Sequence, residues 1–123
     1  MKIPYWSETI TLYHRSEAAN GAVSWKRSVH HGCFWQQRAM RERTEGAEFR
    51  PAGIVCRLPA PYPDVQIGDI IIRGSVSAEI DEYASGKRST NLLKRYAGES
   101  MIVAEVHRNM RGLAGTDHLY AGG

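Results

Sequence analysis

The chain has 123 residues, enough for one domain over residues 1–123 with a single hydrophobic core and little surplus. Its 42% hydrophobic and 24% charged residues are ordinary for a globular protein and exclude a wholly disordered chain. The net charge of +3 is small for a protein that grips duplex DNA, which concentrates basic residues on one face, so we expect at most passing contact with nucleic acid.

Residues 1–8 lack the apolar core of a secretory signal peptide, and no segment approaches the ~20 apolar residues that a membrane-spanning helix needs. We therefore expect the protein to be made in the cytosol and to stay there unless it leaves within an assembly. In this reducing compartment Cys33 and Cys56 are expected to be separate, buried thiols, with a disulfide between them as the less favoured alternative.

The first predicted element is a β-hairpin. Residues 9–15 alternate apolar and polar side chains, which is the two-residue period of a strand with one buried face. Asn20-Gly21 is a favoured turn pair because both residue types tolerate positive φ. A long strand over 23–40 follows, and Trp25 is expected to face Leu12 or one of its neighbours across the hairpin.

The run His30-His31-Gly32-Cys33-Phe34-Trp35 combines a glycine with two large aromatic side chains. Before Gly32 only alternate positions are apolar, whereas Phe34 and Trp35 are adjacent to each other. This change predicts a β-bulge or a sharp bend at Gly32. We expect Trp35 to be buried in a small β core, where replacing it by alanine would cost about 3–5 kcal/mol.

The segment 41–51 has almost no apolar side chains and predicts a long exposed loop. Its arginines are interleaved with glutamates, so the segment neutralises itself and suits reciprocal ion pairs between copies of the chain better than it suits phosphate groups. We expect either a solvated loop or a subunit contact, with direct nucleic-acid binding as a weaker alternative. The candidate subunit-interface residues are Arg38, Arg41, Arg43, Glu45, Glu48 and Arg50.

The middle of the chain predicts two more strands. Residues 53–59 alternate in apolar character, and the prolines that follow make a stiff, non-helical connection. Within 66–74, the turn pair Gly68-Asp69 leads into Ile70-Ile71-Ile72. A β-branched run that is apolar on both faces predicts a central strand covered on both sides, and Ser75–Ile80 is expected to prolong it.

A short helix with basic surroundings is predicted next. Ser89 or Thr90 can cap a helix over 90–96 that Gly98 ends, and its leucines give it one apolar side to pack over an open end of the sheet. The basic side chains around this helix have little acidic compensation. If any surface lines a channel that carries DNA, we expect it here, and the DNA-channel candidates are Lys87, Arg88, Lys94 and Arg95.

Two closing strands complete the predicted sheet. One covers 101–108, with Ile102, Ala104 and Val106 pointing inward, and the other covers 116–121. The periodicity thus predicts about six closely spaced strands and one helix. The expected fold is mainly β: a small antiparallel β-barrel or rolled sheet with one short helix and a long exposed loop.

Residues with catalytic or metal-binding chemistry do not form a recognisable motif. His30, His31 and Cys33 are close in sequence, but a structural zinc site needs four ligands in paired spacings, and no second pair is present. A thiol nucleophile at Cys33, activated by His31 or by His14 or His118 from elsewhere, has no sequence sign of a lowered pKa. The carboxylates show no pairing for acid–base chemistry, and a glycine-rich phosphate loop is absent. We expect no enzymatic activity, no metal and no cofactor.

The order of these segments resembles that of small neck proteins of tailed bacteriophages, called head-closure, head-completion or head–tail connector proteins. The ordered set spans most of the chain and is more specific than any one of its members. The resemblance is carried by His31-Gly32-Cys33-Phe34-Trp35, by Gly68-Asp69-Ile70-Ile71-Ile72-Arg73-Gly74, by the leucine-containing helix, by the strand near Ile102–Val106 and by His118-Leu119-Tyr120-Ala121-Gly122.

The resemblance implies a structural virion protein with a small β-barrel fold. Such proteins form a homo-oligomeric ring that closes the capsid after DNA packaging, contacts a portal or adaptor protein on the head side and offers a docking surface to a tail or tail-terminator protein. Passing contact with genomic DNA in the channel, no membrane contact, and location in the virion neck after assembly in the host cytoplasm are implied as well. A tail-completion or tail-terminator role and an OB-like nucleic-acid-binding module are the alternatives.

Overall fold

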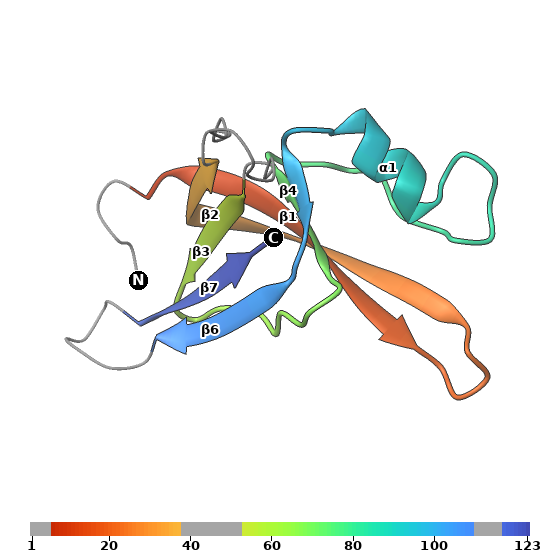
Figure 1. Cartoon of the computed structure of the whole chain (residues 1–123), viewed down its shortest axis with the longest axis horizontal. Coiled ribbons are helices and arrows are strands. Elements are labelled where there is room, and N and C mark those ends of the chain that lie inside the picture. The colour runs from red at the N-terminus through yellow and green to blue at the C-terminus, as the bar shows by residue number, and fades with distance from the viewer. Residues whose placement is uncertain (1–5, 38–52, 110–116) are drawn as a thin grey trace, which may run out of the picture.

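The computed structural model describes residues 6–37, 53–109 and 117–123, which contain seven β-strands and one α-helix (Figure 1). The strands are β1 (Glu8–Glu17), β2 (Val23–Gln37), β3 (Ile54–Pro59), β4 (Ile70–Arg73), β5 (Ser100–Ile102), β6 (Glu105–Asn109) and β7 (His118–Gly122), and the helix is α1 (Ser89–Arg95). Among the described residues no helix is long and apolar enough to cross a membrane.

The strands form one sheet in the order β5-β4-β1-β2-β3-β7-β6, and every neighbouring pair is antiparallel. The predicted mainly β fold with one short helix is therefore confirmed, with seven strands in place of about six. Within the described part of the chain, β5 and β6 are the two ends of this order and do not pair with each other. The sheet is thus open, and the predicted closed barrel is not confirmed.

β1 and β2 form the predicted hairpin, which projects from the rest of the sheet at the lower right of Figure 1. Its turn contains Asn20-Gly21, and the glycine adopts a φ of +88°. The partner predicted for Trp25 is wrong, because the register places Trp25 opposite Arg15 and pairs Leu12 with Ser28. Trp25 therefore lies nearer to the turn than the sequence suggested.

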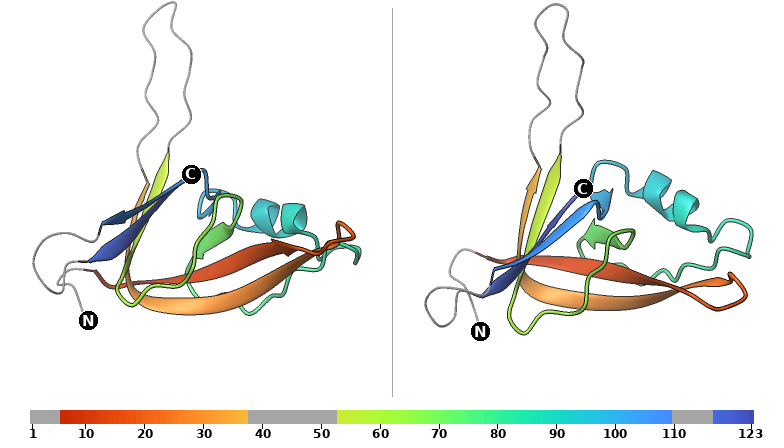
Figure 2. Two further views of the ribbon diagram at one scale, coloured as in Figure 1. Left: turned by 90° about the horizontal axis from the view of Figure 1, so that it is seen from below. Right: turned by 60° about the horizontal axis from the view of Figure 1, so that its bottom comes forward.

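The bulge predicted at Gly32 is present. Glu8 pairs with Cys33 whereas Ile10 pairs with His30, so two steps along β1 correspond to three steps along β2. The glycine takes up the extra residue with a φ of +70°. Beyond the bulge β2 leaves β1 and pairs with β3, and Figure 2 shows the bend that results.

Two hydrophobic clusters lie on opposite faces of the sheet around β4. Ile71 belongs to the larger cluster, and Ile70 and Ile72 belong to the second, so the prediction of a strand covered on both sides is confirmed. Its predicted central position is wrong, because β4 lies next to the end strand β5 in the strand order. The larger cluster consists of Ile10, Leu12, Cys33, Trp35, Ile54, Cys56, Leu58, Val65, Ile71, Met101, Val103, Leu119 and Ala121. The second consists of Tyr13, Ile70, Ile72, Val76, Ile80 and Leu92. The predicted burial of Trp35 is confirmed, since its side chain is only 9% exposed. Both cysteines are free, buried thiols, also as predicted.

The prediction that Ser75–Ile80 prolongs β4 is wrong. In this segment the amide of Val76 donates to Oγ1 of Thr11 over 2.9 Å, and the carbonyl of Ala78 accepts from the Tyr13 hydroxyl over 2.7 Å. Side chains of β1 thus satisfy backbone groups that a neighbouring strand would otherwise satisfy. The segment accordingly lies against one face of β1 and does not add to the sheet.

The strand predicted over 101–108 is divided into β5 and β6, and most of its predicted inward face is wrong. Met101 and Val103 are buried, whereas Ile102 is 54% exposed and Ala104 is also exposed. The side chains therefore alternate with the opposite parity from the predicted one. Ile102 remains accessible because β5 is an edge strand.

A change of strand partner explains this division. The amide of Val103 donates to the carbonyl of Asp69, just before β4, whereas the amide of Ala104 donates to the carbonyl of Gly122 in β7. Val106, which follows the change of partner, packs against the larger cluster as predicted. One continuous run of chain therefore connects the two ends of the sheet.

α1, at the upper right of Figure 1, packs on the second cluster through Leu92, which is buried. The helix begins at Ser89 with Arg88 at the N-cap position, not Ser89 or Thr90 as predicted, and the Arg88 amide donates to Oδ1 of Asn91 over 3.2 Å. The Ser89 hydroxyl is not free for capping because it donates to the carboxylate of Glu82 over 2.6 Å. The predicted apolar side of the helix is nevertheless correct.

Candidate functional site

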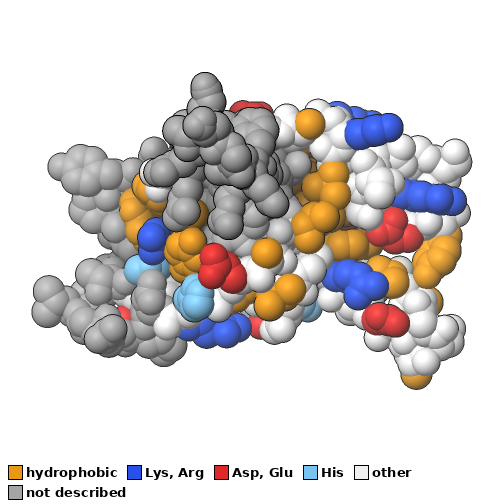
Figure 3. All heavy atoms as spheres, viewed as in Figure 1, with side chains coloured by type: hydrophobic (Ala, Val, Ile, Leu, Met, Phe, Trp, Pro, Cys, Tyr) orange, Lys and Arg blue, Asp and Glu red, His pale blue; other side chains and the backbone are white. Residues whose placement is uncertain are grey.

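The four predicted DNA-channel cations surround α1. Lys87 and Arg88 precede the helix, and Lys94 and Arg95 lie in its last turn. Figure 3 shows Lys and Arg side chains on this side of the molecule, at the upper right. A cavity of about 520 Å³ lies beside the helix. Its lining consists of Ala78, Glu79, Ser85, Gly86, Lys87, Arg88, Leu92 and Arg95. The structure thus brings three of the four predicted cations to one cavity, and Lys94 lies outside its lining.

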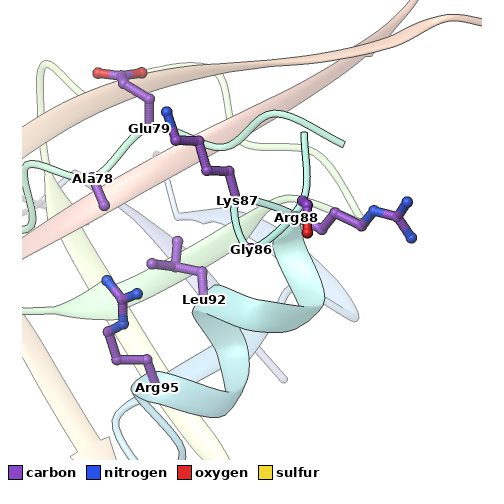
Figure 4. Close-up of a pocket in the computed structure, with 8 residues that line it drawn as sticks. Ala78, Glu79, Gly86, Lys87, Arg88, Leu92 and Arg95 are labelled. Atoms are coloured by element: carbon purple, nitrogen blue, oxygen red, sulfur yellow. The ribbon is translucent and has the colours of Figure 1, made fainter. Parts of the chain in front are cut away.

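Two of these cations reach the cavity from different elements. In Figure 4 the Lys87 side chain extends from the loop toward Glu79, and the Arg95 guanidinium points toward Ala78 and Leu92, whereas Arg88 points away. Leu92 is buried and Ala78 is half-buried. The cavity therefore combines an apolar wall with two positive charges.

Backbone hydrogen bonds hold the loop that forms one wall of the cavity. The amide of Asp81 donates to the carbonyl of Lys87 over 2.8 Å, which closes the loop 81–87. Inside it, the amide of Ala84 donates to the carbonyl of Asp81, and the amide of Lys87 donates to the carbonyl of Ala84. Gly86 permits the last turn with a φ of +78°. The position of Lys87 is thus fixed by the fold of its own loop.

Glu82 anchors this loop to the helix and to the hairpin. Its Oε1 accepts the Ser89 amide over 3.0 Å, and its Oε2 accepts the Ser89 hydroxyl over 2.6 Å and the indole N–H of Trp25 over 3.0 Å. Burial opposes ionisation of Glu82, but the hydrogen bonds from Ser89 and Trp25, with the nearby Arg88, lower its pKa below the usual value. This role of Glu82 could not be predicted from the sequence, because its partner Trp25 lies far away in the chain.

The carboxylate in the cavity lining is already paired. Oε2 of Glu79 accepts from Nε of Arg27 over 2.8 Å, and this hydrogen bond raises the pKa of Arg27. By contrast, Lys87, Arg88 and Arg95 have no ion-pair partner in the ranges 6–37, 53–109 and 117–123. The cavity is therefore positively charged.

The candidate subunit-interface residues lie outside the described residues. They are Arg38, Arg41, Arg43, Glu45, Glu48 and Arg50. The strands on either side of this segment are paired, with Gln37 opposite Ile54. The described residues that flank the segment therefore lie side by side, and the role of the segment in subunit contacts stays a prediction.

The first part of β2 is an open edge of the sheet. In the described part of the chain, the residues of β2 before Phe34 pair with β1 alone. The amide of Arg15 donates to Oδ1 of Asp69, away from β2, and the amide of Val23 donates to the Tyr83 hydroxyl, away from β1. By the alternation of an antiparallel ladder, the backbone groups of Trp25, Arg27 and Val29 also point away from β1. Such groups can pair with another strand.

A row of aromatic and basic side chains on the sheet was not predicted. Phe34, Arg57, Tyr120 and His107 are successive cross-strand partners on β2, β3, β7 and β6. The Arg57 guanidinium lies 4.9 Å from the ring centroid of Tyr120 and 6.0 Å from that of Phe34, and the His107 ring lies 5.6 Å from that of Tyr120. The four segments are far apart in the sequence, so only the strand order reveals the row.

The surroundings of Cys33 do not favour nucleophilic chemistry. Its Sγ lies 3.8 Å and 3.7 Å from the carbonyl oxygens of His30 and His31, and burial raises the pKa of the thiol to about 12. The two imidazoles bond elsewhere, His30 to the Ser28 hydroxyl and His31 to the Thr9 hydroxyl. A smaller cavity of about 250 Å³ lies beside Cys33 and both histidines. Among the described residues, no group of three or more His, Cys, Asp and Glu side chains could hold a metal ion.

Comparison with known proteins places the chain in a family. A model described as a family of unknown function, DUF6751, matches residues 5–123, so the chain belongs to that family. Neither the curated proteins nor the solved structures give a match. The family description states no activity, and a function therefore has to come from the geometry above.

Proposed function

We propose that this member of the DUF6751 family is a structural protein that assembles into a homo-oligomeric ring through its sheet edges. We further propose that the ring sits in the neck of a tailed bacteriophage, connects the portal or adaptor protein to the tail and closes the capsid after DNA packaging. The observation that supports assembly is the open edge of β2 before Phe34. The ordered resemblance of the segments to head-closure proteins supports the neck location.

The sheet offers the two different surfaces that a ring requires. In a ring, one surface of each copy meets a different surface of the next copy. β2 exposes one edge beside the hairpin, and β6 lies at one end of the strand order. If β6 of one copy adds to the β2 edge of the next copy, backbone hydrogen bonds continue from subunit to subunit.

The same proposal includes a barrel-like closure within each copy. β5 and β6 follow each other along the chain, and residues 103–104 between them bond to Asp69, just before β4, and to Gly122 in β7, the strands next to the two ends of the sheet. These bonds support a rolled barrel that closes through residues 103–104. Such a barrel would keep its hydrophobic core intact while the free edges of β2 and β6 contact other subunits.

Oligomeric state tests the assembly step. Replacing Val29 by proline removes an outward-pointing amide of β2 and leaves the β1–β2 ladder in place. Multi-angle light scattering and negative-stain microscopy should show rings for the wild type and for Val29→Ala, which keeps the amide, but a folded monomer for Val29→Pro. Rings of normal size from a folded Val29→Pro variant, or a wild type that stays monomeric at high concentration, would contradict the proposal.

Localisation tests the neck assignment. Antibodies against the protein should label the head–tail junction of particles from the strain that encodes it. Particles that lack the protein should lose their packaged DNA if the ring closes the head. Co-purification with free tails and not with filled heads would instead assign the ring to tail completion.

A nucleic-acid-binding module is the second candidate, and the row Phe34, Arg57, Tyr120 and His107 favours it. Half-buried aromatic rings beside an arginine on a sheet face can stack with bases. Strong, salt-dependent binding of single-stranded DNA by the monomer, abolished by Tyr120→Ala, would support this candidate over the structural ring.

A further inference from the structure

We infer that the cavity between loop 81–87 and α1 binds a nucleoside phosphate unit, either as a free nucleotide or as part of a DNA strand. The cavity, and not the whole basic surface, is the proposed site. All of its lining residues belong to one copy of the chain, so the inference does not depend on ring assembly.

The charge of the cavity favours an anion. Lys87 from the loop and Arg95 from the helix have no ion-pair partner within the described residues, and Glu79 is already bonded to Arg27. An arginine can bind phosphate oxygens with two parallel N–H groups, and a lysine adds a point charge. Because the two cations come from separate walls, an anion with oxygens in several directions suits them better than a planar carboxylate does.

The size and the apolar wall favour a ligand larger than inorganic phosphate. The volume of about 520 Å³ lies within the roughly 300–1,000 Å³ range typical of small-molecule sites. Leu92 and Ala78 supply apolar surface beside the two cations, as Figure 4 shows. A phosphate group held by Lys87 and Arg95 would leave a sugar or a base against this surface. A nucleoside phosphate combines both parts.

The walls of the cavity are held in place before any ligand binds. Hydrogen bonds close loop 81–87 on itself, and Glu82 ties the loop to Ser89 and to Trp25. Binding would therefore order few groups beyond the Lys87 and Arg95 side chains, which keeps the entropic cost of binding low.

Binding of thymidine monophosphate and of a fluorescein-labelled oligodeoxythymidylate tests the inference. The double variant K87Q/R95Q removes both cavity cations. The matched control K26Q/K94Q removes the same charge from positions outside the lining, and Lys94 is the direct neighbour of Arg95. We expect K87Q/R95Q to weaken binding by about tenfold or more and the control by less than about threefold, since only the former loses charge-assisted contacts. For the oligonucleotide, the slope of log binding constant against log salt concentration should be shallower in K87Q/R95Q than in the wild type by roughly 1.4, which is about 0.7 for each of the two lost phosphate contacts.

The results separate the two sources of phosphate. Amide shifts of Gly86, Lys87 and Leu92 in two-dimensional NMR on addition of thymidine monophosphate indicate a free nucleotide, and shifts with the oligonucleotide alone indicate a DNA strand. Equal losses of binding affinity in K87Q/R95Q and in K26Q/K94Q would overturn the proposed site. Wild-type protein that binds neither probe would also overturn it. Displacement of the oligonucleotide by polyglutamate of equal charge would contradict a nucleoside phosphate ligand and indicate an acidic peptide. If only Tyr120→Ala lost binding, the binding site would be the aromatic row and not the cavity. The monomeric Val29→Pro variant should bind like the wild type, so failure of ring assembly does not affect this test.

Discussion

Nδ1 of His14 lies 2.9 Å from Oδ2 of Asp69, a carboxylate that is 1% exposed. The same carboxylate accepts the backbone amides of Arg15 over 3.0 Å and of Gln66 over 2.9 Å. The backbone carbonyl of Asp69 also accepts the amide of Val103. One residue thus joins the hairpin, the connection before β4 and the run between β5 and β6.

Asp69→Ala should lower the free energy of unfolding by about 2–4 kcal/mol, because two backbone amides and an imidazole lose a buried acceptor. Urea denaturation measures this loss. Asp64→Ala is the matched control, since the exposed Asp64 makes a surface ion pair of 3.4 Å with Arg108, which typically contributes about 0–1 kcal/mol. Equally small losses in both variants would show that Asp69 does not join the three segments.

Gly32→Ala should destabilise the protein by about 1–2 kcal/mol, because the bulge holds this residue at a φ of +70°. A Cβ at Gly32 would meet no described atom within 4 Å, so the cost comes from the backbone conformation and not from a clash. Gly53→Ala is the control, because Gly53 lacks a positive φ and its Cβ would make an ordinary contact at 3.8 Å. Thermal unfolding of both variants tests the difference, and equal melting temperatures would argue against the bulge.

Trp35→Ala should cost about 3–5 kcal/mol, since the indole is buried in the larger cluster. Trp35→Phe should cost clearly less, because Nε1 of Trp35 is buried without a hydrogen-bond partner among the described residues and phenylalanine removes that unpaired group. Chemical denaturation compares the two variants. If phenylalanine proves as costly as alanine, the indole N–H contributes to stability and this account of Trp35 is incorrect.

Stability should fall at alkaline pH. Burial raises the pKa of the Cys33 thiol from 9.0 to about 12 and that of the Tyr13 hydroxyl from 10.0 to about 12. Since the unfolded chain releases these protons at lower pH than the folded chain does, the stabilisation is present below pH 9.0 and is lost as the pH rises toward about 12. Urea midpoints measured across this range should decline, and the decline should be shallower in Cys33→Ala. A flat profile for the wild type would contradict the burial of both groups.

Local patterns in the sequence were sufficient for much of the fold. The hairpin followed from Asn20-Gly21 between alternating strands, the bulge followed from Gly32 beside two aromatic residues, and Ile70-Ile71-Ile72 indicated a strand with two covered faces. Each of these features depends on residues within a few positions of each other. Such features can be predicted because turn conformation and burial period are properties of the local chain.

Features that depend on distant partners could not be predicted. The amide of Val103 bonds to Asp69, just before β4, and the amide of Ala104 bonds to Gly122 in β7, so the predicted strand is divided, and Ile102 and Ala104 are exposed where the sequence pattern placed them inward. Gly68-Asp69 was visible as a turn, but nothing nearby in the sequence shows that Asp69 accepts from Arg15. The basic residues near α1 were identified from composition, whereas their grouping around one cavity required the fold.

Hydrogen–deuterium exchange of the assembled protein tests the central claim most directly. The claim is that β2 pairs with a neighbouring copy along the edge that contains Trp25, Arg27 and Val29. Peptides that cover 23–31 should exchange much more slowly in the ring than in the dilute monomer, and peptides that cover α1 should exchange equally in both. Unchanged exchange over 23–31 in a ring that forms would contradict the claim.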